Sequence, residues 1–313
     1  MTSRLQAPII GYTLGDQAGV GPELIARVLP ELTSAAEYRC MGRVIRCTPG
    51  TPTPETAQLA LEHLELAAEA LREGRIDAVV TAPVCKESLQ AIGFRYPGQT
   101  EFFAERLGVA QRHAMCLSGE RLTVALCTTH VALGEVPGLL STERITEVGE
   151  LLCAFLQGLG HSRPRLALAG LNPHNGEAGA FGQEEQSIIS PAVAALRERL
   201  PQAQVSGPCV PDCVYRDAAM GEYDGVISPY HDQALIPLKL LDFHTAVNTT
   251  LGLPRLRVSP DHGTAFALAG KGVANPSSIR HAFALALRYV GLGHAAPTAT
   301  PHAKKEALSA LDI

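Results

Sequence analysis

The sequence predicts an α/β fold, because short apolar strands alternate with polar loops and amphipathic helices along most of the chain. The 313 residues exceed what one hydrophobic core usually serves, and 46% of them are hydrophobic. These observations predict two domains, or one large α/β unit, with a substantial buried core.

The predicted elements follow one another in a regular order. Strands are expected at residues 9–14, 78–80, 114–117, 122–127, 165–169 and 226–227, and helices at 55–73, 102–107, 142–159 and 182–200. Pro22 and Glu23 mark the start of a further helix. Gly74 ends the helix predicted at 55–73. The glycines of residues 15–21 lack GxGxxG spacing, so a Rossmann dinucleotide fold is not indicated.

Composition excludes several classes of protein. The net charge is −5 and no Lys/Arg run occurs, which argues against a nucleic-acid partner. No apolar stretch is long enough to span a bilayer, and residues 1–6 lack the apolar core of a signal peptide, so a cytoplasmic protein is expected. The eight cysteines form no CxxC pair. Cys116, Cys127 and Cys153 lie in apolar runs, which indicates reduced thiols in the core.

The stretch 226–276 carries most of the chemistry. Residues 228–233 are expected to form the loop that leaves a strand, which is where α/β folds place ligand chemistry. Lys239 and Arg257 are cations suited to a phosphate or a carboxylate. The small residues of 261–272 let the backbone approach a ligand closely. The pattern indicates an anion site beside a nucleotide site.

Three histidines share one predicted setting: His130, His174 and His231 each come just after an apolar strand. Parallel strands of one sheet bring such loops to the same edge, so the three imidazoles could meet at one divalent cation, while structural roles for each of them remain open. The other assigned histidines are expected to be solvated surface: His63, His113, His161, His281, His294 and His302. His244 is unassigned.

Motifs along nearly the whole chain resemble those of the 4-hydroxythreonine-4-phosphate dehydrogenase family. They are GDQAGVGPE, TAPVCKESL, GQTEFFAE, VALCTTH, GLNPHNGEAGAFGQEE, YHDQALIPLK, VNTTLGLPRLR and DHGTAFALAG. HGTAFALAGKGVANP is also similar to a loop of the isopropylmalate and isocitrate dehydrogenases. The resemblance implies their two-domain α/β/α fold, with residues 1–97 plus 246–313 as the terminal, nucleotide-side domain and 98–245 as the central metal and dimerisation domain.

The resemblance also implies the site. A divalent metal (Zn, Mg, Co or Mn) would be held by His130 and His174 of one subunit and His231 of its partner in a homodimer. The phosphorylated substrate would contact Gln99, Thr100, Lys239, Asn248 and Arg257. NAD would lie along His262, Gly263, Thr264, Ala265, Gly270 and Asn275. Lys239, Asp212 or a water molecule would act as the base.

The implied reaction is NAD-dependent oxidation, with decarboxylation, of 4-hydroxythreonine 4-phosphate to 3-amino-2-oxopropyl phosphate. Two departures from the family pattern bear on the substrate. Gln99 replaces a histidine, so it cannot carry charge near neutral pH. The region between Glu23 and Ala78 is also shorter. A catabolic paralogue acting on threonate or erythronate 4-phosphate, or on a cis-dihydrodiol carboxylate, is therefore an alternative.

Two readings come from other classes of protein. Three histidines around Zn²⁺ could activate water in a hydrolase, although this leaves the loop from His262 to Pro276 without a role. A non-catalytic nucleotide or metabolite sensor would bind the cofactor without turnover.

Overall fold

The computed structural model describes residues 7–292, which fall into two compact units. Unit 1 contains residues up to 112 and from 247 onward, and unit 2 contains residues 113–246. Residues 98–112 therefore lie with the terminal segments, whereas the expected division put them in the central part. The reason is α4, whose Phe102 and Phe103 are fully buried in the core of unit 1.

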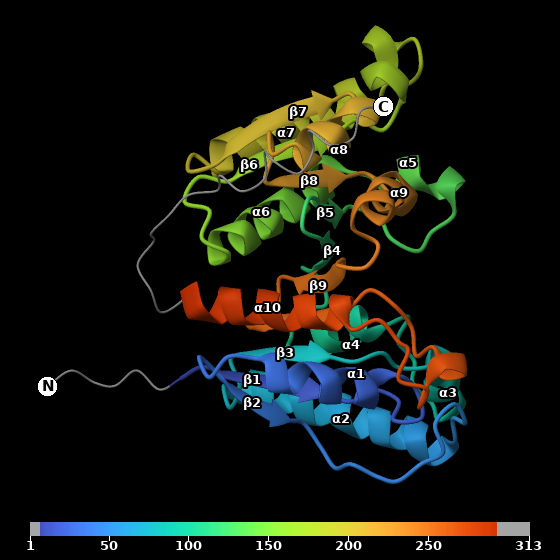
Figure 1. Cartoon of the computed structure of the whole chain (residues 1–313). Coiled ribbons are helices and arrows are strands. Elements are labelled where there is room, and N and C mark those ends of the chain that lie inside the picture. The colour runs from blue at the N-terminus through green and yellow to red at the C-terminus, as the bar shows by residue number, and fades with distance from the viewer. Residues whose placement is uncertain (1–6, 293–313) are drawn as a thin grey trace, which may run out of the picture. The chain divides into compact units, whose positions relative to one another are not determined.

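The strands of unit 1 lie in the order β2-β1-β3-β10-β9, with helices on both faces (Figure 1). Its elements are β1 Ile9–Thr13, α1 Gly21–Val28, β2 Glu37–Cys40, α2 Pro54–Glu73, β3 Ala78–Thr81, α3 Lys86–Ala91, α4 Gln99–Arg106, β9 Val247–Leu251, β10 Leu256–Pro260 and α10 Ser277–Leu292, with single 3-10 turns at Leu29–Glu31 and Phe266–Leu268. All neighbours are parallel except β9, which runs antiparallel to β10.

Alternation along β1 assigns its two faces. Tyr12 meets the ring of Phe283 on α10 edge-on, with ring centres 6.2 Å apart. A Cβ on the preceding Gly11 would approach Ile76 to 2.6 Å, on the face that α2 covers. Because successive side chains of a strand point to opposite faces, α10 and α2 lie on opposite sides of the sheet.

The strands of unit 2 lie in the order β4-β5-β8-β6-β7. Its elements are β4 Ala114–Ser118, β5 Thr123–Leu126, α5 Val136–Leu139, α6 Thr142–Gly158, β6 Arg165–Ala169, α7 Ser190–Arg199, β7 Gln204–Cys209, α8 Pro211–Ala219, β8 Gly225–Ser228 and α9 His231–Asp242, with shorter helical turns at Leu133–Glu135, Pro173–Gly179 and Glu185–Ile189. Only β4 is antiparallel to its neighbour. Helices α6 and α7 cover one face, and α8 and α9 cover the other.

The α/β prediction is confirmed in most elements, including the hairpin of β4 and β5 and the stop of α2 at Gly74, which has φ 73°. Cys116, Cys127 and Cys153 are buried free thiols, as expected. The expectation for His63 is wrong: it is fully buried on α2, and its Nε2 meets the carbonyl oxygen of Arg43 at 2.9 Å.

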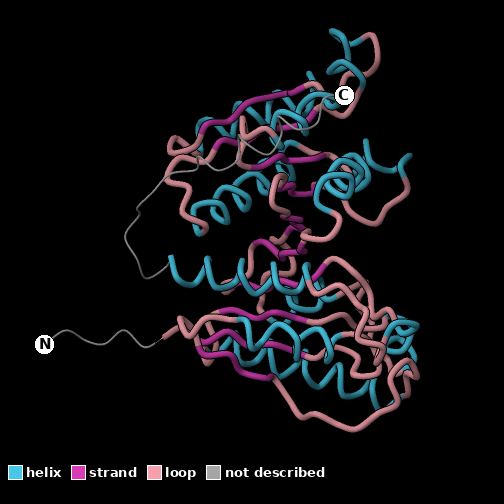
Figure 2. The backbone as a smooth tube through the Cα atoms, in the orientation of Figure 1, coloured by secondary structure: helices cyan, strands magenta, loops and turns pink. Residues whose placement is uncertain are grey.

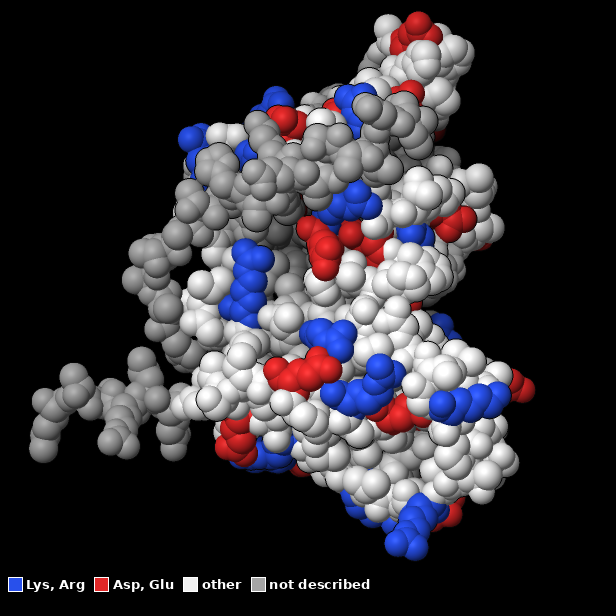
Figure 3. Space-filling view, viewed as in Figure 1, with Lys and Arg blue, Asp and Glu red and all other residues white. Residues whose placement is uncertain are grey.

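The remaining surface predictions have mixed outcomes. His113, His161 and His281 are half-buried, and His161 pairs with Asp224 at 3.4 Å. His294 and His302 lie outside the described residues. Charges of both signs are interspersed over the face drawn in Figure 3. Within 7–292, no helix combines the length and apolarity needed to cross a membrane.

Candidate active site

Three loops meet at the carboxyl edge of the sheet in unit 1. They follow the parallel strands β1, β3 and β10, whose carboxyl ends necessarily share one edge. Asp16 N donates to Pro83 O at 3.0 Å, and Val20 N donates to Thr264 O at 2.9 Å. These backbone bonds fix the loops to one another, at the position where α/β folds bind ligands.

Arg257 on β10 is the central cation of this unit. Its Nε and Nη2 donate to Oγ1 of Thr81 at 3.0 and 2.8 Å, and Nη2 also donates to Oε1 of Gln99 at 2.8 Å. Nη1 donates to Oγ1 of Thr250 at 3.4 Å. All of these partners are neutral oxygens. The guanidinium is oriented by its neighbours, yet within the described chain none of them neutralises its charge.

Burial makes that charge costly. Arg257 is only 2% exposed, and desolvation lowers its pKa to about 9, against a smaller opposing effect of Glu101. At neutral pH the group still carries its proton. A buried cation whose hydrogen-bond partners are all neutral favours binding of an anion, because the anion restores the electrostatic stabilisation that water no longer provides. That Arg257 belongs to an anion site stays a prediction.

Gln99 and Thr100 begin α4, which starts three residues earlier than predicted. Thr250 Oγ1 donates to Oγ1 of Thr100 at 3.3 Å, which joins α4 to the arginine cluster. These side-chain contacts bring the N-terminal end of α4 to the cluster, and a helix N-terminus favours negative charge. Asn248 on β9 has a buried Oδ1 that lacks a hydrogen-bond partner among residues 7–292, as an atom awaiting a ligand donor would.

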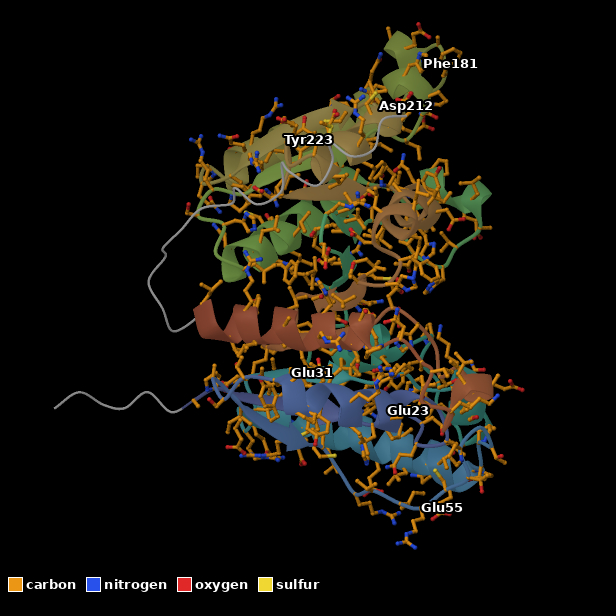
Figure 4. All side chains as sticks on the ribbon, viewed as in Figure 1. Glu23, Glu31, Glu55, Phe181, Asp212 and Tyr223 are labelled. Carbon is orange, nitrogen blue, oxygen red and sulfur yellow. The ribbon has the colours of Figure 1, made fainter. Side chains whose placement is uncertain are left out.

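The predicted cofactor residues lie in the loop between β10 and α10. His262, Gly263, Ala265, Gly270 and Asn275 are exposed. Ala265 has φ 43°, a left-handed conformation that non-glycine residues seldom adopt. Gly270 N donates to Oε2 of Glu23 at 2.8 Å, which fastens the loop to α1, where Figure 4 labels Glu23. The loop is therefore fixed to α1 at Gly270, while most of the predicted cofactor residues face solvent.

The carboxyl edge of unit 2 brings two of the predicted metal ligands together. Thr128 N and Oγ1 both donate to Pro229 O, at 3.2 and 2.8 Å, so the loop after β5 is attached to the segment after β8. As a result, the rings of His130 and His231 lie with their centres 5.4 Å apart. His231 is the first residue of α9, not part of a longer loop as predicted.

The pair fits a divalent metal. Two imidazoles that share a tetrahedral ion have ring centres about 5 Å apart, given metal–nitrogen bonds of about 2 Å. Nδ1 of His231 is 2.6 Å from Oδ1 of Asp232, which orients the ring and leaves Nε2 as the ligand atom. Within residues 7–292, no three His, Cys, Asp or Glu side chains form a metal-binding group, and His130 and His231 lie together as a pair.

His174 lies in the irregular segment Pro173–Gly179 after β6, here called the excursion, rather than beside His130 and His231. Residues 174–178 all have positive φ, between 42 and 72°, which is a rare run for non-glycine residues. The buried carboxylate of Glu185 holds the base of the excursion, since its Oε1 accepts from Leu171 N at 2.8 Å and Asn172 N at 2.7 Å. The resemblance grouped His130 with His174; the structure instead places His130 beside His231 within one chain.

The two candidate bases have different settings. Lys239 is half-buried on α9, with Nζ 5.5 Å from the ring centre of Phe243. Asp212 is exposed in the first turn of α8, after the edge strand β7 (Figure 4). Asp212 follows β7 and His174 follows β6, and these two strands are neighbours in the sheet.

Sequence reasoning missed Thr81, Thr250 and Glu185. Thr81 was expected in the loop after the strand 78–80, and no strand was predicted over Thr250. Both are fully or almost fully buried, in β3 and β9, and polar residues at such positions are a signal that a buried ligand or cation needs them. Glu185 falls near the start of the helix predicted at 182–200, where an acidic residue is common and signals no special role. Glu185 is only 3% exposed, and its carboxylate accepts hydrogen bonds from Leu171 N and Asn172 N, which shows that it holds the chain after β6 in place.

The fold of the chain matches a known class. The crystal structure of a β-decarboxylating dehydrogenase from Thermococcus kodakarensis superposes with a TM-score of 0.51 at 16% identity, over 91% of this chain and 84% of that one. At this identity the likeness concerns the fold alone, and it confirms the predicted isocitrate/isopropylmalate dehydrogenase-like class.

The family itself is identified by sequence. The model of the pyridoxal phosphate biosynthetic protein PdxA family matches residues 23–286, and the chain belongs to this family. A relative from Desulfosudis oleivorans, called 4-hydroxythreonine-4-phosphate dehydrogenase, is 40% identical over 90% of this chain and 95% of its own length. The crystal structure of the Klebsiella pneumoniae enzyme of that name has a TM-score of 0.78 at 36% identity, over 92% of this chain and 99% of that one.

Proposed function

We propose that this chain is a cytoplasmic 4-hydroxythreonine-4-phosphate dehydrogenase, which oxidises and decarboxylates its substrate to 3-amino-2-oxopropyl phosphate with NAD and a divalent metal. The observation that carries the proposal is the buried, oriented and uncompensated guanidinium of Arg257 in a member of the PdxA family. A phosphate group supplies the charge that this environment lacks.

The reaction balances without a further reactant. The carbon that bears the secondary hydroxyl gives a hydride to NAD⁺, and the hydroxyl oxygen loses its proton. The resulting β-keto acid releases CO₂, and the carbon left behind takes up a proton. The net products are NADH, CO₂ and the amino ketone phosphate, without net change in protons.

We assign the following roles to the residues of this chain. Arg257, Thr100, Gln99 and Asn248 bind the substrate, with Arg257 holding its phosphate, and Lys239 is a further substrate-binding residue. The loop 262–275 binds NAD through close backbone contacts. Lys239 or Asp212 acts as proton acceptor, either directly or through water.

His130 and His231 of one copy, with His174 of a second copy, would hold the metal. The ion would lower the pKa of the substrate hydroxyl and polarise the new carbonyl. The division of ligands between copies is supported by the 5.4 Å approach of His130 to His231 and by the separate, exposed excursion that bears His174.

The proposed homodimer has support from the surface of α9. Ile236, Leu240 and Phe243 are 69%, 84% and 65% exposed, and their spacing of four and three residues puts them on one side of the helix. Large apolar side chains gathered in this way are typical of a surface that a partner covers, and a twofold dimer is the commonest solution.

A substrate panel tests the proposal. The metal-loaded protein and NAD would be given 4-hydroxythreonine 4-phosphate, threonate 4-phosphate and a cis-dihydrodiol dicarboxylate separately. Turnover of the first at the highest kcat/KM is expected. Turnover confined to either of the others would replace the proposal by the catabolic alternative that Gln99 raised.

A further inference from the structure

The segment between β2 and α2 forms a strap, defined here as residues 41–53. It contains no helix or strand and is drawn as one continuous loop in Figure 2. Despite this, the strap is not free. Its two ends are attached to the loop after β1, and its far end also packs against the loop 262–275.

The near end is clamped by the side chain of Gln17, which is 5% exposed. Its Nε2 donates to Arg43 O at 2.9 Å, and its Oε1 accepts from Ile45 N at 2.9 Å. Both polar atoms of the amide are therefore used, and the strap backbone is fixed in register against residues 15–20. Arg43 O also meets His63 of α2.

The far end is held by backbone contacts. Gly50 N donates to Ala18 O at 2.7 Å. A Cβ on Gly50 would come within 2.9 Å of Phe266 O, and a Cβ on Gly270 would come within 2.7 Å of Pro49. The close packing at both glycines shows that the strap touches the loop assigned to the cofactor, in addition to the loop after β1.

We propose that Gln17 is a positioning residue for the dinucleotide: through the strap, it fixes the loop 262–275 in the conformation that binds NAD. This inference rests on the proposed function, since it takes the loop as the cofactor site. Both polar atoms of the Gln17 amide bond the strap, so Gln17 would act on the cofactor through the strap. Fixing a binding loop before the ligand arrives removes an ordering cost from binding, so its loss weakens affinity rather than chemistry.

A graded set of variants measures this effect. Gln17→Ala removes both clamp bonds and should raise the Kd and KM for NAD roughly tenfold, with kcat changed by less than about threefold. Gln17→Glu keeps the acceptor for Ile45 N and loses the donor to Arg43 O, so it should be intermediate. Gln58→Ala, on the exposed side of α2, is the control and should resemble the wild type.

Limited trypsin digestion of the full-length protein gives a readout independent of turnover. Arg43 and Arg46 are exposed on the strap, and cleavage there reports how firmly it is held. Gln17→Ala should be cut at these arginines at least about fivefold faster than the wild type, and NAD should slow cleavage of the wild type.

The outcomes separate the two proposals. If the wild type binds no NAD by calorimetry, the proposed function fails. If NAD binds but neither its affinity nor strap cleavage responds to Gln17→Ala, the positioning role is overturned while the proposed function stands. If kcat falls and the Kd for NAD is unchanged, Gln17 acts elsewhere and the inference is also wrong.

Discussion

Nη2 of Arg257 donates to Oε1 of Gln99 at 2.8 Å, while Nε2 of Gln99 donates to the carbonyl oxygen of Ala82 at 3.3 Å. The amide therefore has a fixed orientation, with its oxygen towards the cation. A neutral glutamine here orients Arg257 at every pH in the physiological range.

We expect Gln99→Ala to raise KM for the phosphorylated substrate roughly tenfold, because Arg257 loses an oriented acceptor. Gln99→His should restore part of the affinity but introduce a titration, since histidine changes charge near pH 6.5. The measurement is KM against pH from about 5.5 to 8.5. A flat profile for Gln99→His would show that position 99 does not sense the substrate.

Arg257→Met should separate binding from stability. Removing the cation should lower kcat/KM by about a hundredfold or more, because the phosphate loses a buried charged partner. The free energy of unfolding should rise by about 1 kcal/mol, because a desolvated charge without a counter-ion is replaced by an apolar side chain.

Urea unfolding and steady-state kinetics on the same preparation check both parts of this prediction. Arg257→Lys, which keeps charge but not the planar fork, should also lose activity. A destabilised Arg257→Met protein with normal KM would assign Arg257 to structure alone.

His130→Ala and His231→Ala should each lose bound divalent metal, measured by elemental analysis after gel filtration. His281→Ala, on α10 of unit 1, is the control and should keep it. Glu185→Gln tests the excursion: weakening the clamp at Leu171 N and Asn172 N should lower metal affinity by about 10–100-fold, as expected for groups that position a ligand. Full metal content in His231→Ala would contradict the metal assignment.

The buried imidazole of His63 should make stability depend on pH. Burial lowers the pKa of His63, so the folded protein resists protonation that the unfolded chain accepts below about pH 6.5. The free energy of unfolding should therefore fall as pH drops from about 6.5 towards the lowered folded pKa. His63→Gln, followed by urea midpoints over the same range, should have a shallower decline. An unchanged slope would mean that other groups dominate acid unfolding.

The apolar side of α9 should mediate dimerisation. Leu240→Glu places a charge on the most exposed of its apolar residues and should give monomers in sedimentation velocity, with loss of activity. Met220→Glu, at the end of α8, is the control, since Met220 is also an exposed apolar side chain, at 49%, and this variant should remain dimeric. A dimeric, active Leu240→Glu protein would place the interface elsewhere.

Much of the fold could be predicted from the sequence because strands and helices here follow their periodicity closely. The strand 165–169 agrees in its bounds, and the helix over 55–73 begins one residue earlier. His63 was misjudged because it was read as a polar surface residue, although it lies four residues after Leu59 and four before Ala67, on the buried side of the helix.

The site was only partly predictable. The common edge of the loops that follow β5, β6 and β8 follows from parallel pairing, which strand alternation implies. The approach of His130 to His231 depends on hydrogen bonds between Thr128 and Pro229, and local patterns do not encode such long-range contacts. The acceptor role of Thr81 for Arg257 was equally hidden, since it joins residues 176 positions apart.

The most direct test follows NADH formation and CO₂ release together from 4-hydroxythreonine 4-phosphate, with metal-loaded protein and NAD. The account predicts one CO₂ for each NADH, and loss of both signals in Arg257→Met and after metal removal by a chelator. Bound metal and bound NAD without either product, or equal turnover of the substrate without its phosphate group, would contradict it.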